Sequence, residues 1–135
     1  MKLRILVSYQ IFVGLSDFAT GVLLIFVPEF TLHLMKLNEP SEVLPFLSYI
    51  GTFVLSVGLA CLYGAVLARN VAMDRLEVVW LLTTITRGLV AVFVAIKLAS
   101  GSLEPGWATV AVFDGALAVL QSVGLVRGWL RHVHP

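Results

Sequence analysis

The sequence predicts an all-α integral membrane protein, a bundle of four antiparallel transmembrane helices with both termini in the cytoplasm. Two features of the composition predict this class: 59% of the 135 residues are hydrophobic and only 13% are charged, whereas soluble domains carry about 25% charged residues. The third observation is that the apolar residues form four segments of about 20 residues each, the length that crosses about 30 Å of hydrocarbon. We therefore predict a single transmembrane domain over residues 1–135.

The four apolar segments predict membrane-spanning helices at residues 5–27, 44–68, 76–98 and 107–126. The first segment follows MKLR, as a signal peptide would. It is longer than the apolar region of a signal peptide, contains Gln10 and Asp17, and ends in VPEF rather than at a small-residue cleavage site. We therefore expect this segment to be retained as a helix.

The longest connection, FTLHLMKLNEPSEV, has a helical pattern of its own. Phe30, Leu34 and Leu37 share one apolar face, and polar residues lie between them. This pattern indicates a short interfacial helix over about residues 29–37.

The basic residues predict the orientation. Cytoplasmic loops carry an excess of Lys and Arg. Six basic residues lie at one side of the predicted bundle, namely Lys2, Arg4, Arg69, Arg75, Arg127 and Arg131, whereas Lys36 and Lys97 lie at the other side. Both termini and the 69–75 turn are therefore predicted to be cytoplasmic. The acidic residues of the opposite side are Glu29, Glu39, Glu42 and Glu104.

Three ionisable residues, Asp17, Arg87 and Asp114, lie deep inside predicted spans. Each is costly in lipid unless it faces the protein interior and finds a partner. Counted from the span ends at about 1.5 Å per residue, the three lie near one level at mid-membrane. Ser56 of the second span lies at the same level. We therefore predict a polar layer in which carboxylates from the first and last helices meet Arg87.

A second polar layer is predicted closer to the cytoplasm. A step of seven residues is about two helical turns and keeps the same face. From the first layer this step leads to Gln10, Tyr63, Trp80 and Gln121. Small residues near both layers let helices approach closely, whereas Gly51 and Gly58 of the second span are expected to face lipid.

The charge of the first layer has two interpretations. In the structural one, Asp17 and Asp114 neutralise Arg87 and fix the register of the helices. In the functional one, two carboxylates and one guanidinium leave a surplus negative charge if all three ionise. Either one aspartate then holds a proton, or the site attracts a cation. A lipophilic or cationic ligand, or a transported proton, would use that surplus.

Other functional sites have weaker support. Contact with a quinone or a lipid headgroup would use His33, Lys97, Glu104 and Trp107, and a tail metal site would use His132 and His134. No histidine lies inside a predicted span to ligate haem, and Cys61 has no second cysteine to pair with. Phosphate-binding, hydrolase and zinc-protease motifs are absent, as is a basic stripe for nucleic acid. We therefore predict no cofactor, no metal and no nucleic-acid partner.

Three stretches carry a resemblance to a known family: GLSDFATGVLLIFVPE at 14–29, TRGLVAVFVAIKLASG at 86–101, and the short basic tail. In these the chain resembles the small bacterial four-helix membrane proteins called DoxX-like, whose better-known members look like quinone-associated or accessory membrane subunits. The CxxC pairs of their redox relatives are not matched. Small multidrug transporters are similar in size and have an acidic residue in helix one, here Asp17. They have a tryptophan-tyrosine signature in helix three that is not evident here, and Arg87 would be out of place in them.

We therefore predict a small, non-catalytic accessory or lipophilic-ligand-binding subunit of the bacterial inner membrane. Its partners would be membrane lipids, a lipophilic or cationic ligand, and a larger membrane complex or further copies of itself. The main alternative is a proton-coupled small-molecule carrier in which Asp17 or Asp114 loads the proton. The third is a membrane enzyme acting on a lipid-like substrate, with an aspartate as general acid.

Overall fold

The computed structural model describes residues 2–38 and 40–133, within which the structure is helical and contains no β-strand. The long helices are α1 (Leu3–Phe26), α3 (Leu44–Arg69), α4 (Met73–Ala99) and α5 (Ala108–Val126). By length and composition, four helices of the described chain are able to cross a membrane. This confirms the four predicted helical segments, whose limits agree with the observed helices to within a few residues.

The short elements are α2 (Pro28–Leu34) and three 3-10 turns, η1 (Ser41–Val43), η2 (Pro105–Trp107) and η3 (Trp129–His132). α2 begins at Pro28 because proline, which lacks an N–H, is suited to the first position of a helix. The helix predicted over residues 29–37 exists but ends earlier, because Lys36 adopts a φ of 57°. In this left-handed conformation the Leu37 N–H donates to the Leu32 carbonyl at 2.9 Å, which closes the helix. Glu39 lies outside the described residues.

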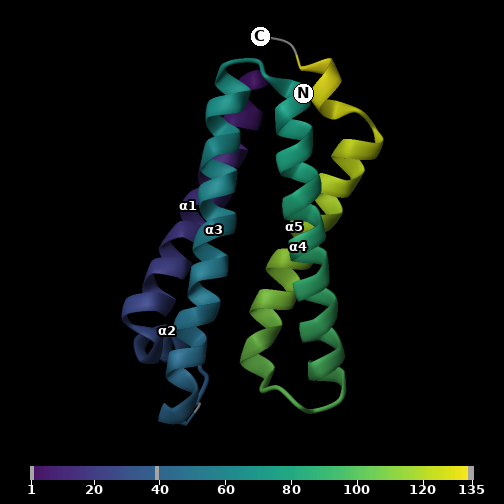
Figure 1. The fold of residues 1–135 in the computed structure, drawn as a ribbon. Coiled ribbons are helices and arrows are strands. Elements are labelled where there is room, and N and C mark those ends of the chain that lie inside the picture. The colour runs from purple at the N-terminus through teal and green to yellow at the C-terminus, as the bar shows by residue number, and fades with distance from the viewer. Residues whose placement is uncertain (1, 39, 134–135) are drawn as a thin grey trace.

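The long helices are arranged as two pairs (Figure 1). α1 packs along α3, and these two helices form the first pair. α4 packs along α5, and they form the second pair. Each pair is made by helices from one half of the chain, and the turn at residues 70–72 joins the halves.

Glycines bring the two helices of the first pair into backbone contact. A Cβ built on Gly58 would lie 2.5 Å from the Phe18 backbone nitrogen, and one built on Gly21 would lie 2.5 Å from the Leu55 nitrogen. Neither site has room for a side chain, so glycine is required for this close approach. Gly51 is buried in the same interface, where a Cβ would lie 2.8 Å from that of Leu24. The expectation that Gly51 and Gly58 face lipid is therefore wrong, because their side of α3 faces the matching glycines of α1.

Two apolar clusters join the pairs, one at each end. The N-terminal cluster consists of Leu6, Leu67, Ala68, Leu76, Trp80 and Leu130. The loop cluster consists of Leu32, Leu37 and Leu47, against which Trp107 packs. The N-terminal cluster combines residues from the two halves of the chain, and Trp107 of the second half packs against the loop cluster of the first half. Both clusters therefore hold the pairs together, one above and one below the middle of the molecule.

The η3 turn is attached to α4 by an ion pair. Arg131 donates from Nε to Glu77 Oε1 at 3.0 Å and from a terminal nitrogen to Oε2 at 3.4 Å. The hydrogen bonds and charge of Glu77 raise the pKa of the exposed Arg131 guanidinium. This contact places Leu130 of η3 over the N-terminal cluster.

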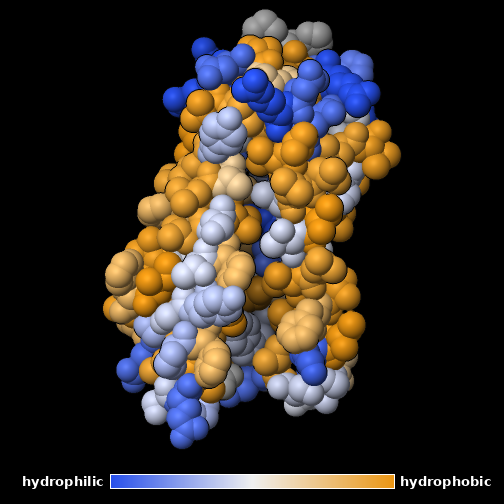
Figure 2. Space-filling view, in the orientation of Figure 1, coloured by the Kyte–Doolittle hydropathy of each residue, from blue (hydrophilic) through white to orange (hydrophobic). Residues whose placement is uncertain are grey.

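Large apolar side chains cover the outer surface of both pairs, and hydrophilic residues gather at the two ends (Figure 2). Val126 is 88% exposed, Phe26 76%, Val112 71% and Phe12 69%. Monomeric soluble proteins rarely expose contiguous apolar patches larger than a few hundred Å². This surface is the one expected of helices that contact lipid.

Candidate functional site

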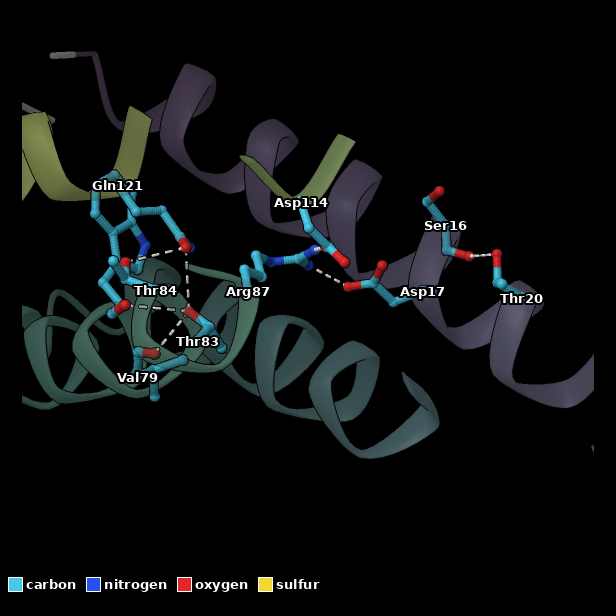
Figure 3. Close-up of polar contacts among 10 residues, drawn as sticks. Ser16, Asp17, Thr20, Val79, Thr83, Thr84, Arg87, Asp114 and Gln121 are labelled. Atoms are coloured by element: carbon cyan, nitrogen blue, oxygen red, sulfur yellow. Dashed lines mark hydrogen bonds and ion pairs between the residues drawn. The ribbon is translucent and has the colours of Figure 1, made fainter. Parts of the chain in front are cut away.

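Arg87 of α4 contacts both predicted aspartates (Figure 3). One terminal nitrogen of its guanidinium donates to Asp114 Oδ1 of α5 at 2.5 Å. The other donates to Asp17 Oδ2 of α1. The Arg87 side chain is only 2% exposed, and those of Asp17 and Asp114 are 10% and 19% exposed. We call these three residues the triad; the structure brings them together as the depth count predicted.

The triad connects the two helix pairs. The Arg87–Asp114 ion pair lies within the second pair, whereas the Arg87–Asp17 ion pair reaches the first pair. Direct packing of α1 against α4 or α5 is slight compared with packing inside each pair. The triad is therefore a polar link at the middle of an interface whose ends are apolar.

The triad combines two carboxyl groups with one guanidinium. Each carboxylate uses one oxygen on Arg87, so Asp17 Oδ1 and Asp114 Oδ2 make no hydrogen bond or ion pair with a described residue. An ammonium group, a hydroxyl group or a proton would satisfy such an oxygen. Of the two aspartate side chains, that of Asp114 is the more exposed.

Phe113 covers part of the guanidinium. The Arg87 Cζ lies 5.9 Å from the centre of the Phe113 ring, which is within cation–π range. Phe113 precedes Asp114 in the chain, so α5 supplies a carboxylate and an aromatic face to the same cation. Both contacts restrict the guanidinium to one orientation.

Ser56 is not part of the triad layer. Its side chain is exposed and its hydroxyl donates to the Thr52 carbonyl at 2.8 Å. The predicted depth of Ser56 does not determine which face of the helix it occupies. The buried face of α3 contains Gly58 and Cys61, and two residues from Gly58 is about 200° around the helix. The prediction that Ser56 lines the polar interior is therefore wrong.

The second predicted layer is present in part. Gln10, Trp80 and Gln121 are buried, with exposures of 0%, 2% and 0%. Tyr63 is 53% exposed and does not belong to this layer. The reason is the same as for Ser56, because Tyr63 lies seven residues further along that outward face of α3. The α3 residue that lies against this layer is the buried Gly64.

Residues that the sequence did not single out complete this layer. Thr83 and Thr84 place their hydroxyls 3.3 Å from Gln121 Oε1 (Figure 3). Tyr9 packs edge-on against Trp80, with ring centres 5.7 Å apart. Thr83 and Thr84 precede Arg87 by four and three residues, so they lie one helical turn from it on the same side of α4. This spacing in the sequence would have been enough to predict that they belong to the layer.

Two glutamines carry open hydrogen-bonding atoms in this layer. Within the described chain, both amide atoms of Gln10 and the Nε2 atom of Gln121 are buried without a hydrogen-bond partner. Gln10 lies against Gly64, where any Cβ would overlap the glutamine amide. The layer is therefore closely packed around Gln10, while part of its hydrogen-bonding capacity is unused.

A furrow runs between the two pairs, and hydrophilic atoms are visible inside it (Figure 2). Paler polar side chains follow α3 beside the furrow. The exposed polar residues of α3 in this region are Tyr49, Thr52, Ser56 and Tyr63. The N-terminal cluster and the loop cluster fill the space between the pairs at the two ends. The furrow therefore opens on the side of the molecule, between the two filled ends.

The other candidate residues do not form a second centre. The predicted outer-surface group is spread over several elements: His33 is exposed on α2, Trp107 packs on the loop cluster, and Lys97 lies 5.8 Å from the ring of Phe93. Glu104 is exposed before η2.

In the tail, His132 Nδ1 lies 2.9 Å from the Gly128 carbonyl oxygen, and His134 is outside the described residues. Within residues 2–38 and 40–133, no group of three His, Cys, Asp or Glu side chains is placed to hold a metal ion.

Comparison of the chain with protein-family models, with curated proteins and with solved structures finds no match. Function is therefore inferred from the triad and its surroundings.

Proposed function

We propose that this chain is a multi-pass protein of the bacterial inner membrane that binds a lipophilic ligand at the triad. The helices would form an antiparallel bundle with both termini in the cytoplasm. The four apolar helices and the excess of basic residues at one end support this topology. The protein would act as a non-catalytic accessory subunit, as the resemblance to DoxX-like proteins implies.

The observation that carries the proposal is the position of the triad. It joins the two helix pairs, between which a furrow runs on an otherwise apolar surface (Figure 2), and its Asp114 side chain is 19% exposed. A ligand that enters this furrow from lipid needs an apolar body. To bind Asp17 Oδ1 or Asp114 Oδ2, its polar group must donate a hydrogen bond or carry a positive charge.

Three single-chain amphiphiles test this ligand class. Dodecylammonium, dodecanol and dodecanoate share one apolar chain and carry cationic, neutral and anionic heads. Thermal unfolding of the purified protein in mild detergent should shift upward most with dodecylammonium, less with dodecanol and not with dodecanoate. A ligand at 100 times its Kd stabilises the folded state by about 2.7 kcal/mol, so the shift is measurable.

Two variants make the test specific. Asp114→Asn removes the more exposed carboxylate and should abolish the preference for dodecylammonium. Ser56→Ala alters an exposed hydroxyl outside the triad and should leave the preference unchanged. Equal shifts with all three amphiphiles, or an unchanged preference in Asp114→Asn, would exclude a ligand site at the triad.

The surplus carboxylate favours a second candidate, a proton-coupled carrier. If Asp17 or Asp114 holds a proton, an arriving cation displaces it. Addition of dodecylammonium to the wild-type protein in weakly buffered detergent solution should then release about one proton per chain. Asp17→Asn and Asp114→Asn should each change this release. Binding without proton release would leave the accessory subunit as the better description.

The accessory role is tested by co-purification. After extraction in mild detergent, an accessory subunit should remain in fixed stoichiometry with a larger membrane complex or with further copies of itself. A stable protein that migrates as a lone chain would contradict this role.

A further inference from the structure

A shallow groove of about 440 Å³ lies on the first three turns of α1, away from the triad. Its lining residues are Arg4, Ile5, Ser8, Tyr9 and Phe12. The Tyr9 ring packs against Trp80 of α4, so one wall of the groove is fixed to the second pair. Phe12 and Ile5 are 69% and 58% exposed and provide an apolar floor.

The chemistry of the groove changes in order along the helix. Arg4, Ser8 and Phe12 are spaced four residues apart, so they lie on one face, with about 6 Å of rise between neighbours. A cation is therefore followed by a hydroxyl group and then by an aromatic ring. A phospholipid has the same order, from its phosphate through the glycerol esters to the acyl chains.

The polar groups of the groove are available to a ligand. Arg4 is exposed and forms no ion pair with another described residue. The Ser8 hydroxyl makes no hydrogen bond within the described chain, whereas those of Thr20 and Ser56 each donate to a carbonyl of the preceding turn. Both polar groups are therefore free to donate to phosphate oxygens.

We propose that this groove binds an anionic phospholipid, with its phosphate on Arg4 and Ser8 and an acyl chain over Ile5 and Phe12. Charge complementarity favours an anionic headgroup, since an arginine binds phosphate through paired hydrogen bonds. Among the described residues at this end of the molecule, basic side chains outnumber acidic ones, which makes the electrostatic potential around the groove positive. The basic residues are Lys2, Arg4, Arg69, Arg75, Arg127 and Arg131, and the acidic ones are Asp74 and Glu77. A basic site at the membrane surface is the usual recognition element for anionic lipids.

Native mass spectrometry of the protein released from nanodiscs tests the site. The nanodiscs contain phosphatidylglycerol as the minor lipid in an excess of phosphatidylcholine, so that preferential retention of the anionic lipid is detectable. The wild type should retain phosphatidylglycerol in preference to phosphatidylcholine. Arg4→Gln should reduce that retention about fivefold, which corresponds to the roughly 1 kcal/mol contributed by one basic side chain near an anionic surface. Ser8→Ala should reduce it by a smaller factor.

Arg69→Gln is the matched control, because Arg69 is another exposed arginine at the same end of the molecule but lies outside the groove. It should lose much less phosphatidylglycerol than Arg4→Gln does, because Arg69 adds only to the general positive charge of this end and does not line the groove. Circular dichroism checks that each variant keeps its helical content. Equal losses in Arg4→Gln and Arg69→Gln would show a diffuse charge effect and overturn the proposal. Equal retention of the two lipids by the wild type would also overturn it.

Discussion

At the scale of residues, Arg87 binds two carboxylates through different nitrogens, so neither aspartate substitutes for the other. The Asp114 contact joins α4 to α5, and the Asp17 contact joins the two pairs. Loss of the guanidinium would therefore strand two buried carboxylates at once. Breaking a buried ion pair by removing one partner is far more damaging than replacing the whole group by apolar or neutral residues.

Arg87→Leu should destabilise the protein by about 3–5 kcal/mol, because the carboxylates are left without a cation. The triple variant Asp17→Asn, Arg87→Leu and Asp114→Asn should recover most of that loss. Thermal unfolding of both variants in the same detergent measures the difference. If the single and triple variants unfold together, the ion pairs contribute little to stability.

The triad was predictable from sequence, whereas two neighbours were not. Asp17, Arg87 and Asp114 are ionisable residues deep in apolar spans, and the cost of a charge in lipid forces them together. Ser56 and Tyr63 are different: the Ser56 hydroxyl bonds to the Thr52 carbonyl of its own helix, and the Tyr63 hydroxyl lies at the tip of a large apolar ring, so neither has to face the interior. Their direction around α3 follows from the close contact of Gly58 with α1, which makes the opposite face of α3 the outward one.

At the scale of elements, glycines on both helices bring the backbones of the first pair together, whereas in the second pair Gly124 of α5 makes room for the large Trp80 side chain of α4. The apolar pattern predicted where each helix lies along the chain, because span length follows from bilayer thickness. It did not predict which helices pack together, since transmembrane helices are apolar on all sides. Glycines at which no Cβ fits show which helices pack together. They are recognised only in the structure, because the atoms that exclude the Cβ belong to the neighbouring helix.

Gly58→Ala should destabilise the protein by about 1–3 kcal/mol, because the new Cβ overlaps the α1 backbone and forces the helices apart. Gly88→Ala is the matched control within α4, where a Cβ meets no atom within 4 Å. It should be neutral or stabilise the protein by up to about 1 kcal/mol, since alanine favours the helix over glycine. Unfolding temperatures of the two variants measure the contrast; equal effects would contradict the close contact at Gly58.

At the scale of the whole molecule, the proposed topology puts the basic end in the cytoplasm. The N-terminal cluster would then lie near the cytoplasmic surface and the loop cluster near the opposite surface. The turn at residues 70–72 and the connection at residues 100–104 would face opposite sides of the membrane. These two connections therefore report the orientation.

Single cysteines test the orientation in a Cys61→Ala background. In intact spheroplasts, a membrane-impermeant maleimide should label Ser102→Cys, and it should label Asn70→Cys only after the membrane is permeabilised. Both positions are exposed, so their reactivity depends on the side of the membrane rather than on burial. The reverse pattern would place the termini outside the cytoplasm.

The division of the chain into two pairs has a consequence for biosynthesis. The first half leaves the ribosome before the second, and it carries Asp17 without the arginine that will bind it. Arg87 and Asp114 belong to the second half and can bind each other during its own insertion. Whatever neutralises Asp17 until then, a proton or a small cation, has to enter the membrane with the first half. If all three groups of the triad ionise in the folded protein, the single guanidinium neutralises only one of the two carboxylates, and the proton or cation that came with Asp17 is still required.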